Sequence, residues 1–208
     1  MNDLASARFN RYRTAPNLLT LLRICMAPFL VAAILERHFA LSFALFVAAG
    51  LTDALDGLLA RLLKQRSQLG EYLDPVADKL LLSTIFLVLM HMSLIPVTVT
   101  VLVFGRDVGI LLVAAILYAA TGRREFSPSL LGKANTLAQV SAVAAVLLQQ
   151  ALLQSRMWQQ PAAVYTVDVF RLVALDATIG LTVASGLHYA WIAAKRVGTN
   201  GVNGHSAK

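Results

Sequence analysis

Residues 53–78 read DALDGLLARLLKQRSQLGEYLDPVAD, and this stretch places four acids within otherwise strongly apolar sequence: Asp53, Asp56, Asp74 and Asp78. An aspartate at the centre of a membrane-spanning helix costs about 2.5–3.5 kcal/mol on insertion scales, so each acid needs a compensating partner. Four acids at this spacing indicate one shared partner, and a divalent cation meets that need. We therefore expect the rest of the chain to hold this cluster at a defined depth.

The composition around this stretch is typical of an integral membrane protein. Of the 208 residues, 58% are hydrophobic and 14% are charged, and the mean hydropathy is +0.68. A soluble domain carries about 25% charged residues. The net charge of +7 is distributed between apolar runs instead of forming one basic stripe with aromatics. Basic residues in such positions set topology and meet anionic lipid, so we expect a lipid bilayer as partner and no nucleic acid.

Six apolar runs predict an all-α fold with six transmembrane helices. The expected spans are 18–35, 40–62, 72–92, 96–120, 132–153 and 169–194. For the basic segment 1–15, a short juxtamembrane helix on the membrane surface and a solvated tail are both open. Residues 16–195 form one membrane domain. A loop is expected over 154–167, with Trp158 and Tyr165 as interface anchors, and a disordered tail over 196–208.

The distribution of basic residues predicts the orientation. With the amino terminus in the cytoplasm, that side receives Arg8, Arg11, Arg13, Lys64, Arg66, Arg123, Arg124, Lys195 and Arg196. The other side keeps Arg37, Arg156 and Arg171. This bias, with an even number of spans, predicts that both termini and the acidic cluster lie at the cytoplasmic face. We expect the membrane to be a bacterial inner membrane.

The spacing of the acids indicates how they act together. Asp53 and Asp56 are three residues apart and share one helix face, as do Asp74 and Asp78, which are four apart. The connection between the two helices is short, so we expect antiparallel neighbours whose carboxylates converge. Mg²⁺ or Mn²⁺ prefers such oxygen ligands, and two ions bridging a pyrophosphate would suit an in-line displacement.

Other readings of these residues predict different patterns. Adjacent charges such as Arg106 and Asp107 can simply pair with each other inside the membrane. An ion-coupled carrier predicts acids spread across the bilayer depth and an internal repeat, whereas these acids cluster at one end. A scaffold without activity predicts the loss of one of the acids. An enzyme is the preferred reading.

The stretch also resembles a known family signature. It consists of D-x-x-D-G-x-x-A-R and G-x-x-x-D-x-x-x-D, separated by eight residues. This chain has the expected residue at every fixed position of the pattern. This pattern resembles that of the CDP-alcohol phosphotransferases. PNLLTLLR (16–23), LDPVADKLL (73–81) and GKANTLAQ (132–139) resemble the branch that makes glycerophospholipids. The resemblance covers roughly residues 15–195.

The resemblance implies transfer of a phosphatidyl group from CDP-diacylglycerol to an alcohol, with release of CMP. It implies that Asp53, Asp56, Asp74 and Asp78 bind a divalent metal pair and that Asp78 is also the general base. Contacts to the CDP-lipid are implied for Asn17, Thr20, Gly57, Ala60, Arg61, Ser67 and Gly70. For Asn17 and Thr20, helix capping is an equal alternative. The family also implies a homodimer.

The acceptor alcohol is the open question. Arg106 and Lys133 are the expected acceptor-binding residues, because an anionic acceptor needs cations. Glycerol 3-phosphate is the first choice, which would give a phosphatidylglycerophosphate synthase. Phosphatidylglycerol is the alternative, which would give a cardiolipin synthase. Asp107 and Asn135 resemble the residues typical of the cardiolipin synthase branch at these positions. Gly132 instead resembles the phosphatidylglycerophosphate synthase branch.

Overall fold

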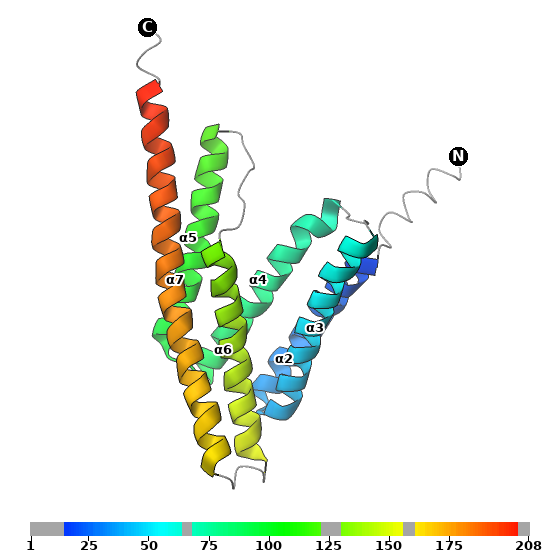
Figure 1. The fold of residues 1–208 in the computed structure, drawn as a ribbon. Coiled ribbons are helices and arrows are strands. Elements are labelled where there is room, and N and C mark those ends of the chain that lie inside the picture. Colours follow the sequence, from blue (N-terminus) through cyan, green and yellow to red (C-terminus); the bar gives the residue numbers. More distant parts are fainter. Residues whose placement is uncertain (1–14, 64–67, 122–129, 156–160, 204–208) are drawn as a thin grey trace, which may run out of the picture. The chain divides into compact units, whose positions relative to one another are not determined.

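The computed structural model describes residues 15–63, 68–121, 130–155 and 161–203, although not every side chain within them. These residues form six helices and no strand, which confirms the predicted all-α class for this part of the chain. Figure 1 follows them in chain order: α2 (Ala15–Leu35), α3 (Phe39–Leu63), α4 (Gln68–His91), α5 (Val97–Thr121), α6 (Leu130–Gln154) and α7 (Pro161–Asn203). The first five follow the predicted spans closely at both ends.

The last helix differs from the prediction at its start. A loop was expected over 154–167, but α7 begins at Pro161, so that half of this segment is helical. Proline suits the first helical turn, because its missing N–H would have no partner there and its φ is already helical. Tyr165 therefore lies on a helix, with its side chain exposed. Trp158 lies outside the described residues.

The end of α7 also differs from the prediction. The expected span stops at residue 194 and a disordered tail was expected over 196–208, but α7 continues to Asn203. Extending an existing helix adds a hydrogen bond for each residue ordered, whereas starting one is costly. Polar residues can therefore prolong a helix that an apolar segment has begun. The expected N-terminal segment lies almost wholly in residues 1–14, outside the described part of the chain.

Two helices end in a Schellman motif without glycine. Arg37 and Ser93 have φ values of 61° and 58°, in the left-handed region. The Arg37 N–H donates to the Ile34 carbonyl at 3.0 Å, and the His38 N–H to the Ala33 carbonyl at 2.8 Å. Ser93 and Leu94 repeat this pair of bonds at the end of α4. These bonds satisfy carbonyls that the helix end leaves open.

We expect Ser93→Gly to raise the free energy of unfolding by about 0.5–1 kcal/mol, because glycine adopts positive φ without a Cβ clash. Thermal unfolding in detergent measures the change. Ser83→Gly is the matched control: it makes the same replacement inside α4, where glycine should lower stability by about 0.5 kcal/mol. Equal losses in both variants would contradict the prediction.

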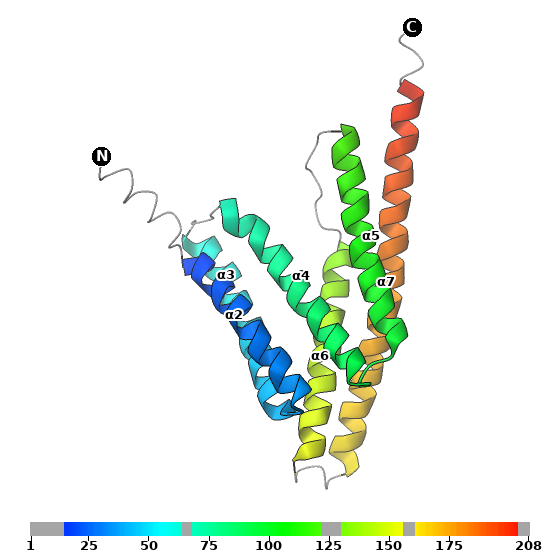
Figure 2. The same cartoon turned by 180° about the vertical axis from the view of Figure 1, so that it is seen from behind.

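The helices form two compact units. The first comprises Met1–Leu94 and Val143–Asp168, and the second Ile95–Ala142 and Val169–Lys208. In the first unit α2 packs against both α3 and α4, and the views in Figures 1 and 2 show α2 and α3 side by side. Its core holds Leu30, Ile34, Ile85, Phe86, Leu89 and Leu147.

Small residues and a few polar bonds complete this first unit. Ala33, Ala49 and Ala145 are buried, as expected where helices approach closely in a membrane protein. At the end of α6, the Gln154 side-chain amide donates to the Arg37 carbonyl at 2.7 Å. Five residues earlier in α6, the Gln149 amide donates to the Asp168 carboxylate. These bonds join the end of α6 to the α2–α3 turn and to the start of α7.

The outer surface of the helices is apolar. Large hydrophobic side chains are exposed on every described helix, for example Phe29, Leu80, Val101, Leu137 and Val173. Large exposed apolar side chains in this number are typical of helices that contact lipid or another protein. By length and composition, one helix in the described part of the chain, α6, is apolar enough to cross a membrane. Three shorter apolar stretches are Ile24–Leu35, Phe39–Asp53 and Lys79–His91. Six membrane spans therefore stay a prediction.

Candidate functional site

The backbone places the first half of the acidic signature on one continuous helix. Asp53, Asp56, Gly57, Ala60 and Arg61 all lie within α3. Because the helix is unbroken, positions 53 and 56 share one face, as the sequence predicts. The Asp53 side chain is exposed. An exposed carboxylate at this position is accessible to an ion or a substrate.

The second half of the signature lies on α4. Gly70, Asp74 and Asp78 are all helical, so positions 74 and 78 share a face one turn apart. Both α3 and α4 belong to the first unit. The acid-bearing segments are the second half of α3 and the first half of α4, which follow one another in the chain. The predicted helical pairing of the acids along each helix is therefore confirmed at the level of the backbone.

Most of the remaining signature is known only through its backbone. Asn17 and Thr20 lie in α2, and their side chains, like those of Asp56, Arg61, Asp74 and Asp78, are outside those described. Ser67 lies outside the described residues altogether. Among the described side chains, no three His, Cys, Asp or Glu residues come together. Convergence of the four acids and the contacts to CDP-lipid stay predictions.

The donor set nevertheless fits a hard divalent cation. Four carboxylates arranged as two same-face pairs on consecutive helices supply oxygen ligands only. Mg²⁺ and Mn²⁺ prefer such ligands and share their coordination shell with phosphate. Asp53, Asp56, Asp74 and Asp78 are the residues that would hold the metal.

A second polar cluster lies in the other unit, where α5 meets α7. The Arg106 guanidinium contacts the Asp107 carboxylate at 2.7 Å, and both side chains are almost buried, with 6% and 11% exposed. The Arg106 Nε donates to the Ser185 hydroxyl at 3.1 Å. The guanidinium carbon also lies 5.9 Å from the centre of the Tyr189 ring. The alternative reading, in which Arg106 pairs with Asp107, is confirmed, and this ion pair needs no ligand to balance its charge. Acceptor binding by Arg106 stays a prediction.

The cluster continues from α7 onto α6. The Thr182 hydroxyl donates to the Asn135 side-chain carbonyl at 2.9 Å, and both residues are buried. Lys133, the other expected acceptor-binding residue, lies near the start of α6 in the same unit, with its side chain exposed. An exposed ammonium is available to an anionic ligand at low desolvation cost.

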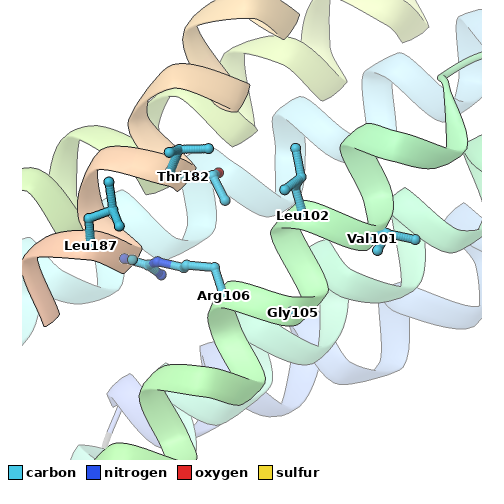
Figure 3. A pocket seen from close by; sticks show the side chains of 8 residues that line it. Val101, Leu102, Gly105, Arg106, Thr182 and Leu187 are labelled. Atoms are coloured by element: carbon cyan, nitrogen blue, oxygen red, sulfur yellow. The ribbon is translucent and has the colours of Figure 1, made fainter. Parts of the chain in front are cut away.

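A groove opens beside this cluster (Figure 3). It has a volume of about 300 Å³ and is bounded by α5 and α7. Its lining is mostly apolar, with one cation and one hydroxyl: Val101, Leu102, Gly105, Arg106, Thr182, Val183, Gly186 and Leu187. Figure 3 shows the Arg106 side chain reaching from α5 toward α7. Such a lining suits a ligand that has both polar and apolar parts.

The α7 side of this cluster was not anticipated from the sequence. Thr178, Thr182 and Ser185 are buried, and Tyr189 is half-buried. Their spacing of four, three and four residues is a helical stripe of hydroxyl groups within an apolar helix. This stripe was a usable signal, because polar residues on one face of a membrane helix tend to face other helices instead of lipid.

Comparison with known proteins supports the signature. Residues 13–188 match the CDP-alcohol phosphatidyltransferase family. The cardiolipin synthase (CMP-forming) of Rattus norvegicus is 39% identical over 163 residues, covering 69% of this chain and 53% of that protein. The chain thus spans about half the length of the mammalian cardiolipin synthases that it matches.

Two bacterial relatives are covered more completely. A probable phosphatidylglycerophosphate synthase of Mycobacterium tuberculosis is 31% identical over 195 residues, covering 90% of this chain and 85% of that protein. The CDP-diacylglycerol–glycerol-3-phosphate 3-phosphatidyltransferase of Bacillus subtilis is 33% identical over 149 residues, covering 64% and 76%. With the complete acidic signature on α3 and α4, these matches show that the chain belongs to the CDP-alcohol phosphatidyltransferase family.

Proposed function

We propose that the protein transfers a phosphatidyl group from CDP-diacylglycerol to a glycerol-type alcohol, with glycerol 3-phosphate as the first candidate, and releases CMP. The observation that carries this proposal is the complete acidic signature, held on two consecutive helices of a chain that matches the family over residues 13–188. The relatives named for this reaction come from two bacteria and a plant chloroplast.

The reaction needs one bond to form and one to break. The acceptor hydroxyl oxygen forms a bond to the phosphorus that bears the diacylglycerol, and the bond from that phosphorus to the CMP oxygen breaks. Asp78 takes the hydroxyl proton as the oxygen attacks. The family is in general dependent on divalent metal ions. When bound by the four aspartates, such ions would neutralise the charge of the pyrophosphate.

The CDP moiety would lie against α3. Gly57 is a helix-interior glycine, which costs about 1 kcal/mol relative to alanine, so close approach of a ligand to the backbone is a reasonable cause. Arg61, one turn further along α3, would bind a phosphate through two N–H groups of its guanidinium. Ala60, Ser67, Gly70, Asn17 and Thr20 complete the proposed contacts to the CDP-lipid.

Cardiolipin synthesis, with phosphatidylglycerol as acceptor, is the second candidate. Identity favours it, since mammalian cardiolipin synthases match at 39–40% and the two bacterial phosphatidylglycerophosphate synthases at 31–33%. The matched share of the relatives' own length favours glycerol 3-phosphate as acceptor. The probable phosphatidylglycerophosphate synthase of Mycobacterium tuberculosis is matched over 85% of its length. In either case the exposed Lys133 and the buried Arg106 are the proposed acceptor-binding residues.

The proposed setting is a membrane. The exposed apolar side chains of the described helices and the apolar length of α6 support a membrane setting, for which six spans are proposed. The distribution of basic residues along the sequence supports both termini and the acidic cluster at the cytoplasmic face, and a bacterial inner membrane is the proposed membrane. The expected homodimer belongs to the same proposal. A cytoplasmic cluster would meet a lipid pyrophosphate at headgroup depth.

The deciding measurement is CMP release by the purified protein with CDP-diacylglycerol and Mg²⁺ or Mn²⁺. Glycerol 3-phosphate and phosphatidylglycerol are offered in parallel, and release of CMP with the first alone supports a phosphatidylglycerophosphate synthase. Release with the second alone supports a cardiolipin synthase. Chelation of the metal with EDTA should abolish either activity. Absence of release with both acceptors would contradict the proposed function.

A further inference from the structure

The groove between α5 and α7 makes demands on a ligand that the acidic signature does not explain. It lies entirely within the second unit and has a volume of about 300 Å³. Its lining is apolar except for a guanidinium on α5 and a hydroxyl on α7, those of Arg106 and Thr182. Figure 3 shows the Arg106 side chain reaching across the groove toward α7. A ligand that fills the groove must be largely apolar and must suit these two polar groups.

Arg106 presents a fixed hydrogen-bond donor to the groove. The Arg106 Nε donates to Ser185, and the Arg106 Nη1 donates to Asp107. Neither N–H of the Arg106 Nη2 has an acceptor among the described residues. With 6% of this side chain exposed, bulk water satisfies these donors poorly, and a guanidinium has no acceptor of its own. The groove therefore favours a ligand with an oxygen acceptor next to Nη2.

Thr182 presents the opposite requirement. Its hydroxyl hydrogen is already used, because the group donates to the Asn135 side-chain carbonyl at 2.9 Å. A hydroxyl group has a single hydrogen, but its oxygen can still accept. Since Thr182 lines the groove, a ligand there can donate to this oxygen. Together the two polar groups suit a ligand that carries one acceptor and one donor.

The balance of charge indicates that both ligand groups are neutral. Of the described residues that line the groove, Arg106 alone carries a charge, and Asp107 balances it at 2.7 Å. A phosphate or carboxylate on the ligand would place an unbalanced negative charge near Asp107, where both side chains are almost buried. A phospholipid would meet this repulsion, because its phosphate is only a few bonds from its ester groups. An ester carbonyl as acceptor and an alcohol as donor avoid this cost.

We propose that the α5–α7 groove binds an uncharged glyceride, a diacylglycerol of the membrane. One ester carbonyl accepts from the Arg106 Nη2, and the free hydroxyl donates to Thr182. One acyl chain follows the exposed apolar lining: Val101, Leu102, Val183 and Leu187. The inference rests on the proposed membrane setting but not on the proposed reaction. When the glyceride occupies Arg106, the exposed Lys133 remains for an anionic acceptor.

Two glycines leave room for this ligand. Gly105 and Gly186 line the groove, one from each helix, and a Cβ built on either would meet no atom within 4 Å. Packing within the chain therefore does not require glycine at these positions, although glycine inside a helix costs about 1 kcal/mol relative to alanine. A molecule outside the chain that approaches the two backbones gives a reason for this cost.

The first test changes the ligand and leaves the protein intact. Native mass spectrometry in detergent micelles measures binding of 1,2-dioleoylglycerol and of three analogues. The 1,2-di-O-oleyl ether lacks the carbonyls, the 3-O-methyl derivative lacks the donor, and dioleoyl phosphatidic acid adds a charge. We expect the ether to bind at least about tenfold more weakly, because it loses a hydrogen bond to a charged group. We expect about two- to tenfold weaker binding of the methyl derivative, and weaker binding of phosphatidic acid. Equal binding of ester and ether, or tighter binding of phosphatidic acid, would overturn the inference.

The second test fills the groove. Gly105→Leu and Gly186→Leu should each lower the affinity for 1,2-dioleoylglycerol by about tenfold, because the new side chain competes with the ligand for space. Gly109→Leu on α5 and Gly180→Leu on α7 are the matched controls, since a Cβ there also meets no atom within 4 Å and neither glycine lines the groove.

We expect the two control variants to bind the glyceride like the unmodified protein. Unchanged binding in the groove variants, or an equal loss in groove and control variants, would contradict the proposed site. CMP release is assayed separately. Its absence would refute the proposed function and would leave the result for the glyceride unaffected.

Discussion

Asp78→Asn is expected to lower the rate of CMP release by about 10²–10⁴-fold, the usual contribution of a general base. Asparagine keeps the size of the side chain and its place one turn after Asp74 on α4, but it cannot take the proton of the acceptor hydroxyl. Binding of CDP-diacylglycerol in the presence of Mg²⁺ should be partly retained, because Asp53, Asp56 and Asp74 remain. Single-turnover CMP release and equilibrium binding of the lipid nucleotide measure the two effects separately.

Asp176→Asn is the matched control for this prediction. Asp176 lies on α7 with its side chain exposed and takes no part in the proposed site. We expect its replacement to leave both CMP release and nucleotide binding unchanged. Normal turnover in Asp78→Asn would refute the base assignment. Loss of nucleotide binding equal to the loss of turnover would show that Asp78 serves as a metal ligand alone.

Asp107→Ala is expected to lower the free energy of unfolding by about 3–5 kcal/mol, the cost of removing one partner from a buried ion pair. Arg106 would keep the Ser185 hydroxyl and the Tyr189 ring, but its charge, with only 6% of the side chain exposed, would lose the carboxylate at 2.7 Å. Unfolding by heat or denaturant in detergent measures the loss.

The double variant Arg106→Met, Asp107→Leu distinguishes a broken pair from a lost packing contact. Replacement of both partners by apolar residues of similar volume is often neutral or stabilising, so most of the lost stability should return. If the double variant is as unstable as Asp107→Ala, the charge of Arg106 is not the cause. Arg106→Met alone should raise the acceptor KM if Arg106 also binds the acceptor.

The helices themselves were predictable from the sequence for a simple reason. Apolar runs bounded by polar connections specify helices wherever the backbone must satisfy its own hydrogen bonds, and α2 to α6 follow those runs closely. The acidic signature was equally local, because its positions are three and four residues apart on helices. Errors arose where no hydrophobic boundary exists: at the start of α7, set by Pro161, and at its polar end.

The sequence by itself determined the helical class, the positions of the acids along α3 and α4, and the family, because each depends on residues close together in the chain. Asp53, Asp56, Asp74 and Asp78 therefore stood out without coordinates. Only the tertiary structure showed that Arg106 also contacts Ser185, and that Asn135 meets Thr182 while its amide nitrogen has no partner among the described residues. The Asn135–Thr182 and Arg106–Ser185 contacts join residues 47 and 79 positions apart. Burial and hydrogen-bond satisfaction are properties of packed helices, and no local pattern in the chain encodes them.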